Sequence, residues 1–239
     1  MNRSKVKFFL IGVFCAFLIM LITLLVAIKT PRVFDGLMWR IERFQGRDSY
    51  PQRTLENFLY RLNSWQDQSS PKGSFYLIGD SHLQLIPQHL SAWSLNFAIN
   101  GQPMSRLITR VGQLPGLKSA GAVIVNGGEN DLAYGISVDE IEGYWKQLFK
   151  QNPDIKRFVC VGLPMTERQR RDLEKVKLLN TKIEQVCREN GAPFVQVQMG
   201  QGVFFGYSLA IDNVHLARET MAPFAALLER TARAQATRS

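Results

Sequence analysis

Short apolar runs alternate with longer segments of helical periodicity along the C-terminal part of the chain. The apolar runs predict five strands, at residues 75–78, 94–99, 121–125, 157–161 and 193–197. Apolar positions three and four residues apart predict helices at 103–113, 138–151, 167–190 and 216–234. Such strands have no polar face to turn to water, so we expect helices to cover both sides of them. The pattern therefore predicts an α/β fold with a mostly parallel five-stranded sheet.

The first apolar segment of the chain is much longer than these strands. Phe8 to Ile28 contains no charged residue and no proline, and about 20 apolar residues are enough for a helix to cross a bilayer. A cleaved signal peptide is the alternative, but its apolar region is only about 7–15 residues long and ends at a small-residue cleavage site, which this sequence lacks. Cys15 follows Phe14 rather than a small residue, which argues against a lipoprotein. We therefore expect a short basic tail at 1–7 and one transmembrane anchor at 8–28.

Basic residues flank this segment on both sides, so the flanking charges do not fix its orientation. Three of them lie at positions 3–7 and four at positions 29–43. Long C-terminal domains translocate largely regardless of such charges. We expect the N-terminus in the cytoplasm and the domain on the periplasmic or extracytoplasmic side of a bacterial inner membrane.

Residues 29–72 are expected to link the anchor to a domain at 73–239. Apolar residues at helical spacing from Val33 to Phe44 have arginines between them. They predict an amphipathic helix that either lies on the membrane surface or packs on the domain. A second helix is expected at 54–65, followed by a loop at 66–73.

Composition and charge limit the classes of function. The chain is 46% hydrophobic and 21% charged, which is typical of a folded protein and excludes a disordered one. The net charge of +9 comes from basic residues scattered along the chain, so no nucleic-acid partner is expected. Three cysteines are too few for a disulfide scaffold, and none lies in a CxxC pair or beside a histidine cluster, so no zinc site is expected. Cys160 and Cys187 are expected to be isolated core residues.

Polar residues follow several of the predicted strands at the point where each strand ends. Gly79–His82 (GDSH) follows the first strand, Asn100–Gly101 the second, Asn126–Asp131 (NGGEND) the third and Asp212–His215 (DNVH) the fifth. In an open α/β sheet, ligands bind at the carboxyl ends of the strands. These four segments are therefore expected to meet in one site.

The side chains of these segments have the chemistry of a serine nucleophile. Ser81 lies at a strand-to-helix turn, and a serine hydroxyl needs a base to accept its proton. His215 can act as that base, and Asp212 can orient its imidazole. The N–H groups of Ser81 and Gly101 and the side-chain amide of Asn130 can stabilise a developing oxyanion.

Each of these residues also has a purely structural interpretation. Asp80–Ser81 could cap the following helix, and Gly101 could serve a turn with positive φ. Asn130–Asp131 could form an Asx-turn or a helix cap, and Asp212–His215 could be a solvated pair in a loop. All of these interpretations would have to hold independently, although the residues fall in order at successive strand ends.

In these segments the sequence resembles the SGNH/GDSL hydrolases. The four residues that name the family occur in order as Ser81, Gly101, Asn130 and His215, and the similarity covers about residues 74–235. The resemblance implies a three-layer α/β/α sandwich similar to flavodoxin. It also implies an acyl hydrolase that works without a metal or another cofactor.

The resemblance leaves the reaction partly open. A membrane-anchored serine esterase is expected, acting on an ester such as an O-acetyl group, with an acylated glycan or lipid as the candidate substrate. Some family members instead transfer acyl groups, chiefly acetyl, onto cell-surface polysaccharides, so an O-acyltransferase with the same triad is one alternative. A non-catalytic module that binds glycan or a partner protein is another, although it would not need the full set of residues. His82 and Leu216 replace a usual leucine and a frequent proline of the family, at positions that take no part in proton transfer.

The acyl pocket has only a weak signature in the sequence. Phe204, Phe205 and Tyr207 lie just before Asp212 and either line this pocket or pack as part of an ordinary loop. A small acyl group is expected, because the domain has no long insertion to build a lipid-sized tunnel. The charged run at 168–177 is expected to be a solvated helix face, with a contact to anionic polysaccharide or lipid headgroups as the other interpretation.

Overall fold

The computed structural model describes residues 14, 16–22, 53–84, 86, 89–90, 93–165, 172–196, 216 and 218–237. The chain divides into two compact units, Met1–Glu56 and Asn57–Ser239. In the first unit, residues 16–22 are helical and their apolar side chains are exposed. Within the described ranges, no helix is both long enough and apolar enough to cross a membrane. Most of the expected anchor at 8–28 and all of the amphipathic segment from Val33 to Phe44 lie outside the described residues.

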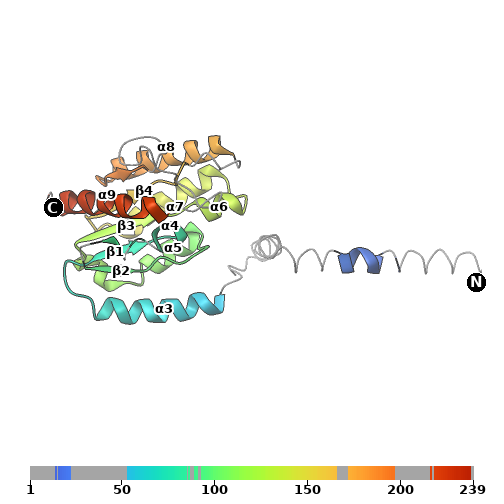
Figure 1. Cartoon of the computed structure of the whole chain (residues 1–239), viewed down its shortest axis with the longest axis horizontal. Coiled ribbons are helices and arrows are strands. Elements are labelled where there is room, and N and C mark those ends of the chain that lie inside the picture. The colour runs from blue at the N-terminus through green and yellow to red at the C-terminus, as the bar shows by residue number, and fades with distance from the viewer. Residues whose placement is uncertain are drawn as a thin grey trace, which may run out of the picture. The chain divides into compact units, whose positions relative to one another are not determined.

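The second unit is built on a five-stranded sheet in which all neighbouring strands are parallel (Figure 1). The strand order is β2-β1-β3-β4-β5. The strands are β1 (Phe75–Ile78), β2 (Ser94–Asn96), β3 (Ala122–Asn126), β4 (Phe158–Val161) and β5 (Phe194–Val195). The predicted parallel α/β sheet is therefore confirmed. Every residue of β1, β3 and β4 is buried, which explains why these strands appear in the sequence as uninterrupted apolar runs.

Helices precede, connect and follow these strands. They are α3 (Arg53–Gln68), α4 (Ser81–Gln84), α5 (Met104–Val111), η2, a 3-10 helix (Pro115–Ser119), α6 (Glu129–Ala133), α7 (Val138–Gln151), α8 (Leu173–Glu189) and α9 (Arg218–Ala236). The longer helices lie where periodicity predicted them. Helix α7 begins where expected because Ser137 accepts a hydrogen bond from the Glu140 N–H at 3.2 Å, which satisfies a free donor of the first turn. The short helices η2 and α6 were not predicted, since five residues show no helical period, and α4 was expected only as a helix of unspecified length after the turn at Ser81.

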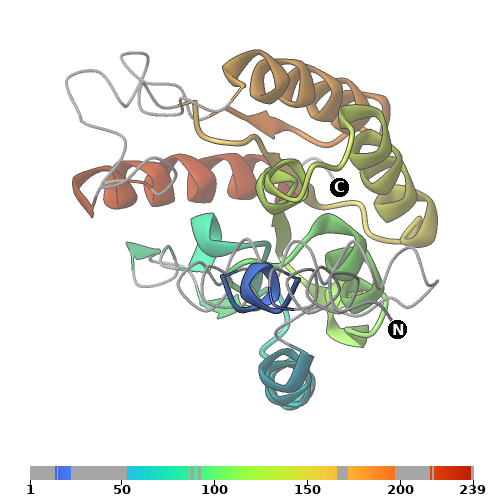
Figure 2. The same ribbon diagram turned by 90° about the vertical axis from the view of Figure 1, so that its right-hand side faces the viewer.

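The helices cover the two faces of the sheet unequally. Helices α4 and α9 lie on one face, and α5, α7 and α8 lie on the other (Figures 1 and 2). On the first face, Leu77 and Ile124 of the sheet share a buried cluster with Leu83 of α4 and Phe224 of α9. On the other face, the ring of Phe158 contacts that of Phe149 in α7, with centroids 5.0 Å apart. These layers form the α/β/α sandwich that the family resemblance implied.

Helix α3 is fixed to this sandwich by a buried carboxylate. Asp67 accepts a hydrogen bond from the Tyr76 hydroxyl at 2.9 Å and another from the Gly116 N–H at 3.1 Å. Burial raises the pKa of Tyr76 to about 12, and the nearby Asp67 also raises it. The phenol therefore stays protonated and donates to Asp67 at every physiological pH.

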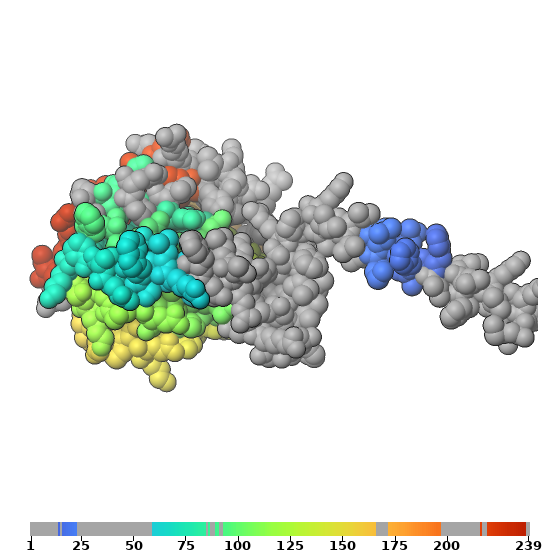
Figure 3. Space-filling view, turned by 90° about the horizontal axis from the view of Figure 1, so that it is seen from below, coloured from blue at the N-terminus to red at the C-terminus, as the bar shows by residue number. Residues whose placement is uncertain are grey.

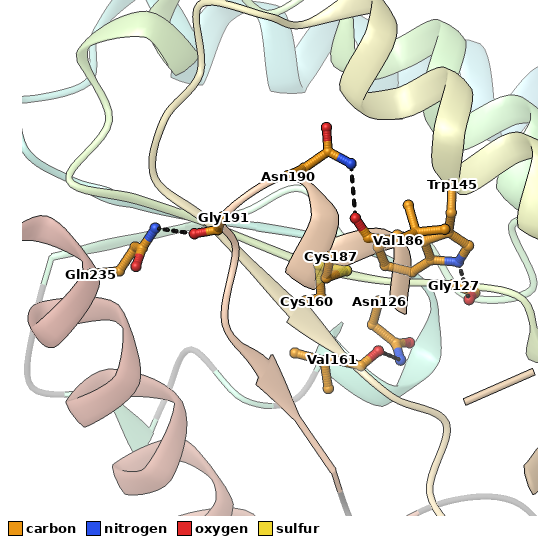
Figure 4. The surroundings of a disulfide bond; sticks show 10 residues. All are labelled: Asn126, Gly127, Trp145, Cys160, Val161, Val186, Cys187, Asn190, Gly191 and Gln235. Atoms are coloured by element: carbon orange, nitrogen blue, oxygen red, sulfur yellow. Dashed lines mark hydrogen bonds between the residues drawn. A yellow bond between two sulfur atoms is a disulfide. The ribbon is translucent and has the colours of Figure 1, made fainter. Parts of the chain in front are cut away.

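A disulfide bond joins Cys160 of β4 to Cys187 of α8 (Figure 4). The expectation that these cysteines are isolated core residues is therefore wrong, although both are buried. The Cα atoms are 6.4 Å apart across a sequence separation of 27 residues, which the alternation of strand and helix does not reveal. The bond fastens α8 covalently to the sheet.

The described part of the charged run, residues 172–177, behaves as an exposed face of α8. Lys175 pairs with Asp172 at 2.5 Å and Lys177 pairs with Glu174 at 2.8 Å, and all four side chains are about half exposed or more. The solvated-face interpretation therefore holds for this stretch.

Candidate active site

The segment after β1 places Ser81 at the carboxyl-terminal edge of the sheet. Asp80 is fully buried, and its Oδ1 accepts a hydrogen bond from the His82 N–H at 3.0 Å. The carboxylate therefore caps the start of α4, as the structural interpretation of Asp80 expected. Ser81 is the first residue of α4 and is partly exposed, so this cap also fixes the turn on which Ser81 lies.

Gly79 allows this turn to lie against the end of β3. A Cβ atom at Gly79 would be 2.8 Å from the backbone oxygen of Asn126, which is closer than a side chain tolerates. Residue 79 therefore has to be glycine for the Asp80–Ser81 turn and the Gly127–Asp131 segment to lie side by side.

Asn130 connects three strand ends through its side-chain amide. Its Nδ2 lies 3.4 Å from Oδ2 of Asp80 and 3.4 Å from the carbonyl oxygen of Gln102. Asp80 directly precedes Ser81, and Gln102 directly follows Gly101. The structure thus brings together the segments that carry Ser81, Gly101 and Asn130.

Gly101 has a φ of +76°, a left-handed conformation that favours glycine over other residues. The turn that the structural interpretation expected is therefore present. It lies in the connection between β2 and α5, directly beside the Asn130 amide.

Asp131 is a buried carboxyl group next to this cluster. Its Oδ2 accepts a hydrogen bond from the Met104 N–H at 2.8 Å and so caps the start of α5. Burial raises the pKa of Asp131 from 3.8 to about 7, the Met104 N–H lowers it, and the Asp80 carboxylate raises it. Asp131 therefore lies within α6 and caps a different helix, α5, rather than its own. Its carboxyl group ionises only near neutral pH.

A polar network beside Gly101 was not found from the sequence. Arg110 of α5 is 1% exposed, and its guanidinium donates to the side-chain oxygen of Gln102 and to the backbone oxygen of Phe97. Gln102 in turn donates to the hydroxyl of Tyr60 in α3 at 3.1 Å. The available signal was that Arg110 follows Leu107 by three residues, which places a charged residue on the apolar face of a predicted helix.

Several predicted site residues lie outside the described residues. These are the candidate base His215 and its partner Asp212, together with the candidate pocket residues Phe204, Phe205 and Tyr207. The residue after His215 is described: Leu216 is buried in the same hydrophobic cluster as Leu83 of α4. Within the described part of the chain, no group of acidic, histidine or cysteine side chains could hold a metal ion.

Comparison with known families agrees with this arrangement. Residues 78–233 match the GDSL-like Lipase/Acylhydrolase family, and the chain belongs to that family. It is an ester-bond hydrolase. No curated protein sequence matches the chain significantly.

Solved structures show the same fold at low sequence identity. A GDSL-like lipase from Bacteroides thetaiotaomicron has a TM-score of 0.59 at 19% identity, covering 73% of this chain and 97% of its own. A lipase/acylhydrolase from Enterococcus faecalis has a TM-score of 0.57 at 15% identity, with coverages of 68% and 96%. A catalytic serine-to-alanine mutant of an acetylxylan esterase from Geobacillus stearothermophilus has a TM-score of 0.55 at 16% identity, with coverages of 68% and 94%.

Proposed function

We propose that the chain is a membrane-anchored serine esterase in which Ser81 is the nucleophile. The observation that carries this proposal is the position of the Asn130 amide, between the residue before Ser81 and the residue after Gly101. An oxyanion hole needs several donors that converge beside the nucleophile. The N–H groups of Ser81 and Gly101 and the amide of Asn130 are the donors we assign to it.

The reaction runs in two steps through an acyl-enzyme. The Ser81 hydroxyl attacks the ester carbonyl while His215 takes its proton, and Asp212 orients the imidazole. The tetrahedral intermediate collapses, the bond to the alcohol breaks, and His215 returns the proton to the departing alcohol. Water then attacks the acyl group and gives a proton to His215. The bond between the acyl carbon and the Ser81 oxygen breaks, and His215 returns the proton to that oxygen, which frees Ser81 and the carboxylic acid.

Two observations support the assignment of His215 and Asp212. Leu216, the residue after His215 in the sequence, lies in the core that also contains Leu83, two residues after Ser81. The solved acetylxylan esterase is described as a catalytic mutant in which a serine is replaced by alanine, and a serine nucleophile needs a base with an orienting partner.

The proposed location is the extracytoplasmic side of the membrane, with residues 8–28 as the anchor. Residues 16–22 form a helical stretch whose apolar side chains are all exposed, which is characteristic of a helix that belongs in lipid. The Cys160–Cys187 disulfide supports the extracytoplasmic location of the domain, because disulfides form and persist in oxidising compartments rather than in the cytosol. Alkaline phosphatase fused to the C-terminus of the full-length protein should be enzymatically active, because that enzyme is active only outside the cytoplasm. An inactive phosphatase fusion together with a fluorescent GFP fusion would show the opposite orientation, with the domain in the cytoplasm.

The proposed substrate is a small acyl ester, an O-acetyl group on a glycan being the leading candidate. One structural neighbour is described as an acetylxylan esterase, and the described residues of the domain include no long insertion that could enclose a lipid chain. We assign Phe204, Phe205 and Tyr207 to the acyl pocket.

The test uses the full-length protein in detergent, with Ser81→Ala and His215→Ala as variants. We would measure hydrolysis of p-nitrophenyl acetate and butyrate together with covalent labelling by a fluorophosphonate. The wild type should label and turn over, acetate faster than butyrate, and Ser81→Ala should do neither while keeping its melting temperature. Unchanged activity in Ser81→Ala would overturn the proposal. If acyl transfer to an added oligosaccharide exceeded hydrolysis, a sugar hydroxyl rather than water would be the acceptor, and the protein would be an O-acyltransferase.

A further inference from the structure

The connection from β2 to α5, residues 97–103, carries the proposed oxyanion donor Gly101. Its first residues extend the pairing with β1, since the Phe97 N–H donates to the Leu77 oxygen at 2.8 Å and the Ile99 N–H donates to the Gly79 oxygen at 2.9 Å. Beyond Ile99 this pairing ends. The positive-φ turn at Gly101 is closed by the Gln102 N–H, which donates to the Ile99 oxygen at 3.2 Å, and side-chain contacts hold this turn from outside.

Arg110 holds this connection on both sides of Gly101. Its Nη1 donates to the carbonyl oxygen of Phe97, and its Nη2 donates to Oε1 of Gln102 at 2.5 Å. Phe97 is the first residue of the connection and Gln102 is the last but one, so one guanidinium spans the segment that contains Gly101. The planar fork of arginine is suited to bind two acceptors at a fixed separation.

Helix α3 supplies the outer side of the same network. The Gln102 Nε2 donates to the Tyr60 hydroxyl at 3.1 Å, and the Arg110 Cζ lies 5.9 Å from the centroid of the Tyr60 ring. With its amide oxygen toward Arg110, Asn63 also accepts from Nη1 at 3.2 Å. Figure 3 shows α3, in cyan, lying on the outside of the domain next to the green surface that includes α5.

The same glutamine also reaches the amide of Asn130. The Gln102 carbonyl oxygen accepts from the Asn130 Nδ2 at 3.4 Å, while the Gln102 side chain is held by Arg110 and Tyr60. Fixing Gln102 therefore fixes two proposed oxyanion donors at once, namely the neighbouring Gly101 N–H and the Asn130 amide.

We propose that Arg110, Gln102 and Tyr60 are positioning residues that hold the oxyanion hole in its reactive geometry. This inference rests on the proposed function of Ser81. It extends the functional unit to α3, which lies before the residues that match the family. None of the three side chains needs to touch the substrate, because they act through the backbone of residues 101 and 102. Substitutions of these residues should lower kcat rather than raise KM, since the oxyanion exists only in the transition state and the intermediate.

The test compares two tyrosines that both link α3 to the domain. Tyr60→Phe removes the hydroxyl that holds Gln102, and Tyr76→Phe removes the hydroxyl that donates to Asp67 at 2.9 Å. Both variants keep the ring and remove a hydroxyl that links α3 to the rest of the domain. Only the first loss is connected to Gly101, so Tyr76→Phe is the matched control.

We expect Tyr60→Phe in the full-length protein to lower kcat for p-nitrophenyl acetate roughly 5- to 10-fold, because small misplacements of catalytic groups are costly. Its KM should stay within about 2-fold of the wild-type value. Gln102→Met, which removes both side-chain contacts at similar volume, should lower kcat by about 100-fold, as for loss of an oxyanion donor. Tyr76→Phe should lower the melting temperature more than Tyr60→Phe does and leave kcat unchanged.

Two outcomes would overturn this inference alone. One is a wild-type kcat in Tyr60→Phe, and the other is a loss of kcat in both tyrosine variants in proportion to their loss of thermal stability. In either case Ser81-dependent labelling and turnover of the wild type would leave the proposed function standing. Equal turnover by the wild type and Ser81→Ala would instead overturn the proposed function, and this inference with it.

Discussion

The side-chain nitrogen of Asn130 lies 3.4 Å from the carboxylate of Asp80, although the two residues are 50 positions apart in the sequence. Asp80 ends the turn after β1, and Asn130 lies in the short helix after β3. The contact forms because β1 and β3 are parallel neighbours in the sheet, so their carboxyl ends meet at one edge. Ser81, the residue after Asp80, is thereby brought to the amide that we assign to the oxyanion hole.

Replacing Asn130 should therefore reduce catalysis far more than stability. Asn130→Ala removes one oxyanion donor, and we expect kcat for p-nitrophenyl acetate to fall by about 10²–10³-fold. Asn152→Ala is the matched control, because this asparagine only donates to the Leu148 oxygen within its own helix end. A kcat for Asn130→Ala within a factor of two of the control would remove Asn130 from the oxyanion hole.

Gly79→Ala should damage the site through the backbone. Its Cβ would lie 2.8 Å from the Asn126 oxygen, so either the turn before Ser81 or the end of β3 has to move. We expect a loss of stability of about 1–3 kcal/mol and a loss of activity that exceeds the unfolded fraction. Both are measured by denaturant unfolding and ester hydrolysis of the same sample.

The control for this substitution is Gly143→Ala. Gly143 lies in the exposed middle of α7, with no atom within 4 Å of an added Cβ. Alanine should stabilise the helix there by about 0.5–1 kcal/mol and leave activity unchanged. If both variants behaved alike, the close approach at Gly79 would have no importance for the site.

Removing the disulfide should destabilise the fold substantially. For the separation of 27 residues between Cys160 and Cys187, the chain-entropy relation gives about 3–4 kcal/mol. We expect the Cys160→Ala/Cys187→Ala double variant to melt at a lower temperature than the wild type. Added reductant should lower the melting temperature of the wild type and leave that of the double variant unchanged. Thiol titration of the unfolded wild type without reductant should detect Cys15 only. Detection of all three cysteines would contradict the bond.

Asp131 should make stability depend on pH between about 4 and 7. Its pKa is raised from 3.8 to about 7 by burial, so in this window the folded state keeps a proton that the unfolded state releases. Stability contributed by the neutral carboxyl is present below pH 4 and is lost as pH rises through 7. Asp131→Asn cannot ionise and still offers the Met104 N–H an acceptor. Its melting temperature relative to wild type should therefore rise from pH 4 to 7 and then level off.

An exposed carboxylate provides the comparison for this pH profile. Asp154 is 69% exposed and pairs with Lys118 at the surface, so Asp154→Asn should keep the wild-type slope between pH 4 and 7. A wild-type slope in Asp131→Asn as well would show that other groups cause the pH dependence.

The sequence was sufficient for the sheet and the longer helices because each carries a periodic or uninterrupted apolar pattern. The runs FYLI and FVCV became β1 and β4, and Val138–Gln151 became α7 with the predicted bounds. Burial on both faces is what makes such strands recognisable. Helices of one turn, such as α4, have no period, so their start at Ser81 could be known only from the cap that Asp80 provides.

Contacts between distant segments were not accessible in the same way. Cys160 and Cys187 look like two ordinary apolar residues until the register of β4 against α8 is known. Arg110 likewise appears as one charge in an amphipathic helix, and its two acceptors come from a connection that precedes it. The positions of Ser81, Gly101 and Asn130 were predictable because strand ends of a parallel sheet share an edge. The residues that hold them follow from side-chain packing, which has no local signature.

The disulfide also changes what happens when the chain is cut. Cys160 and Cys187 enclose the stretch between them in a covalent ring, so one proteolytic cut inside it leaves both fragments attached to each other. A nicked molecule would run as an intact chain in a denaturing gel and fall into two pieces only after a reductant is added. After such a cut the sheet and α8 would stay together, whereas the same cut in a reduced protein would separate them.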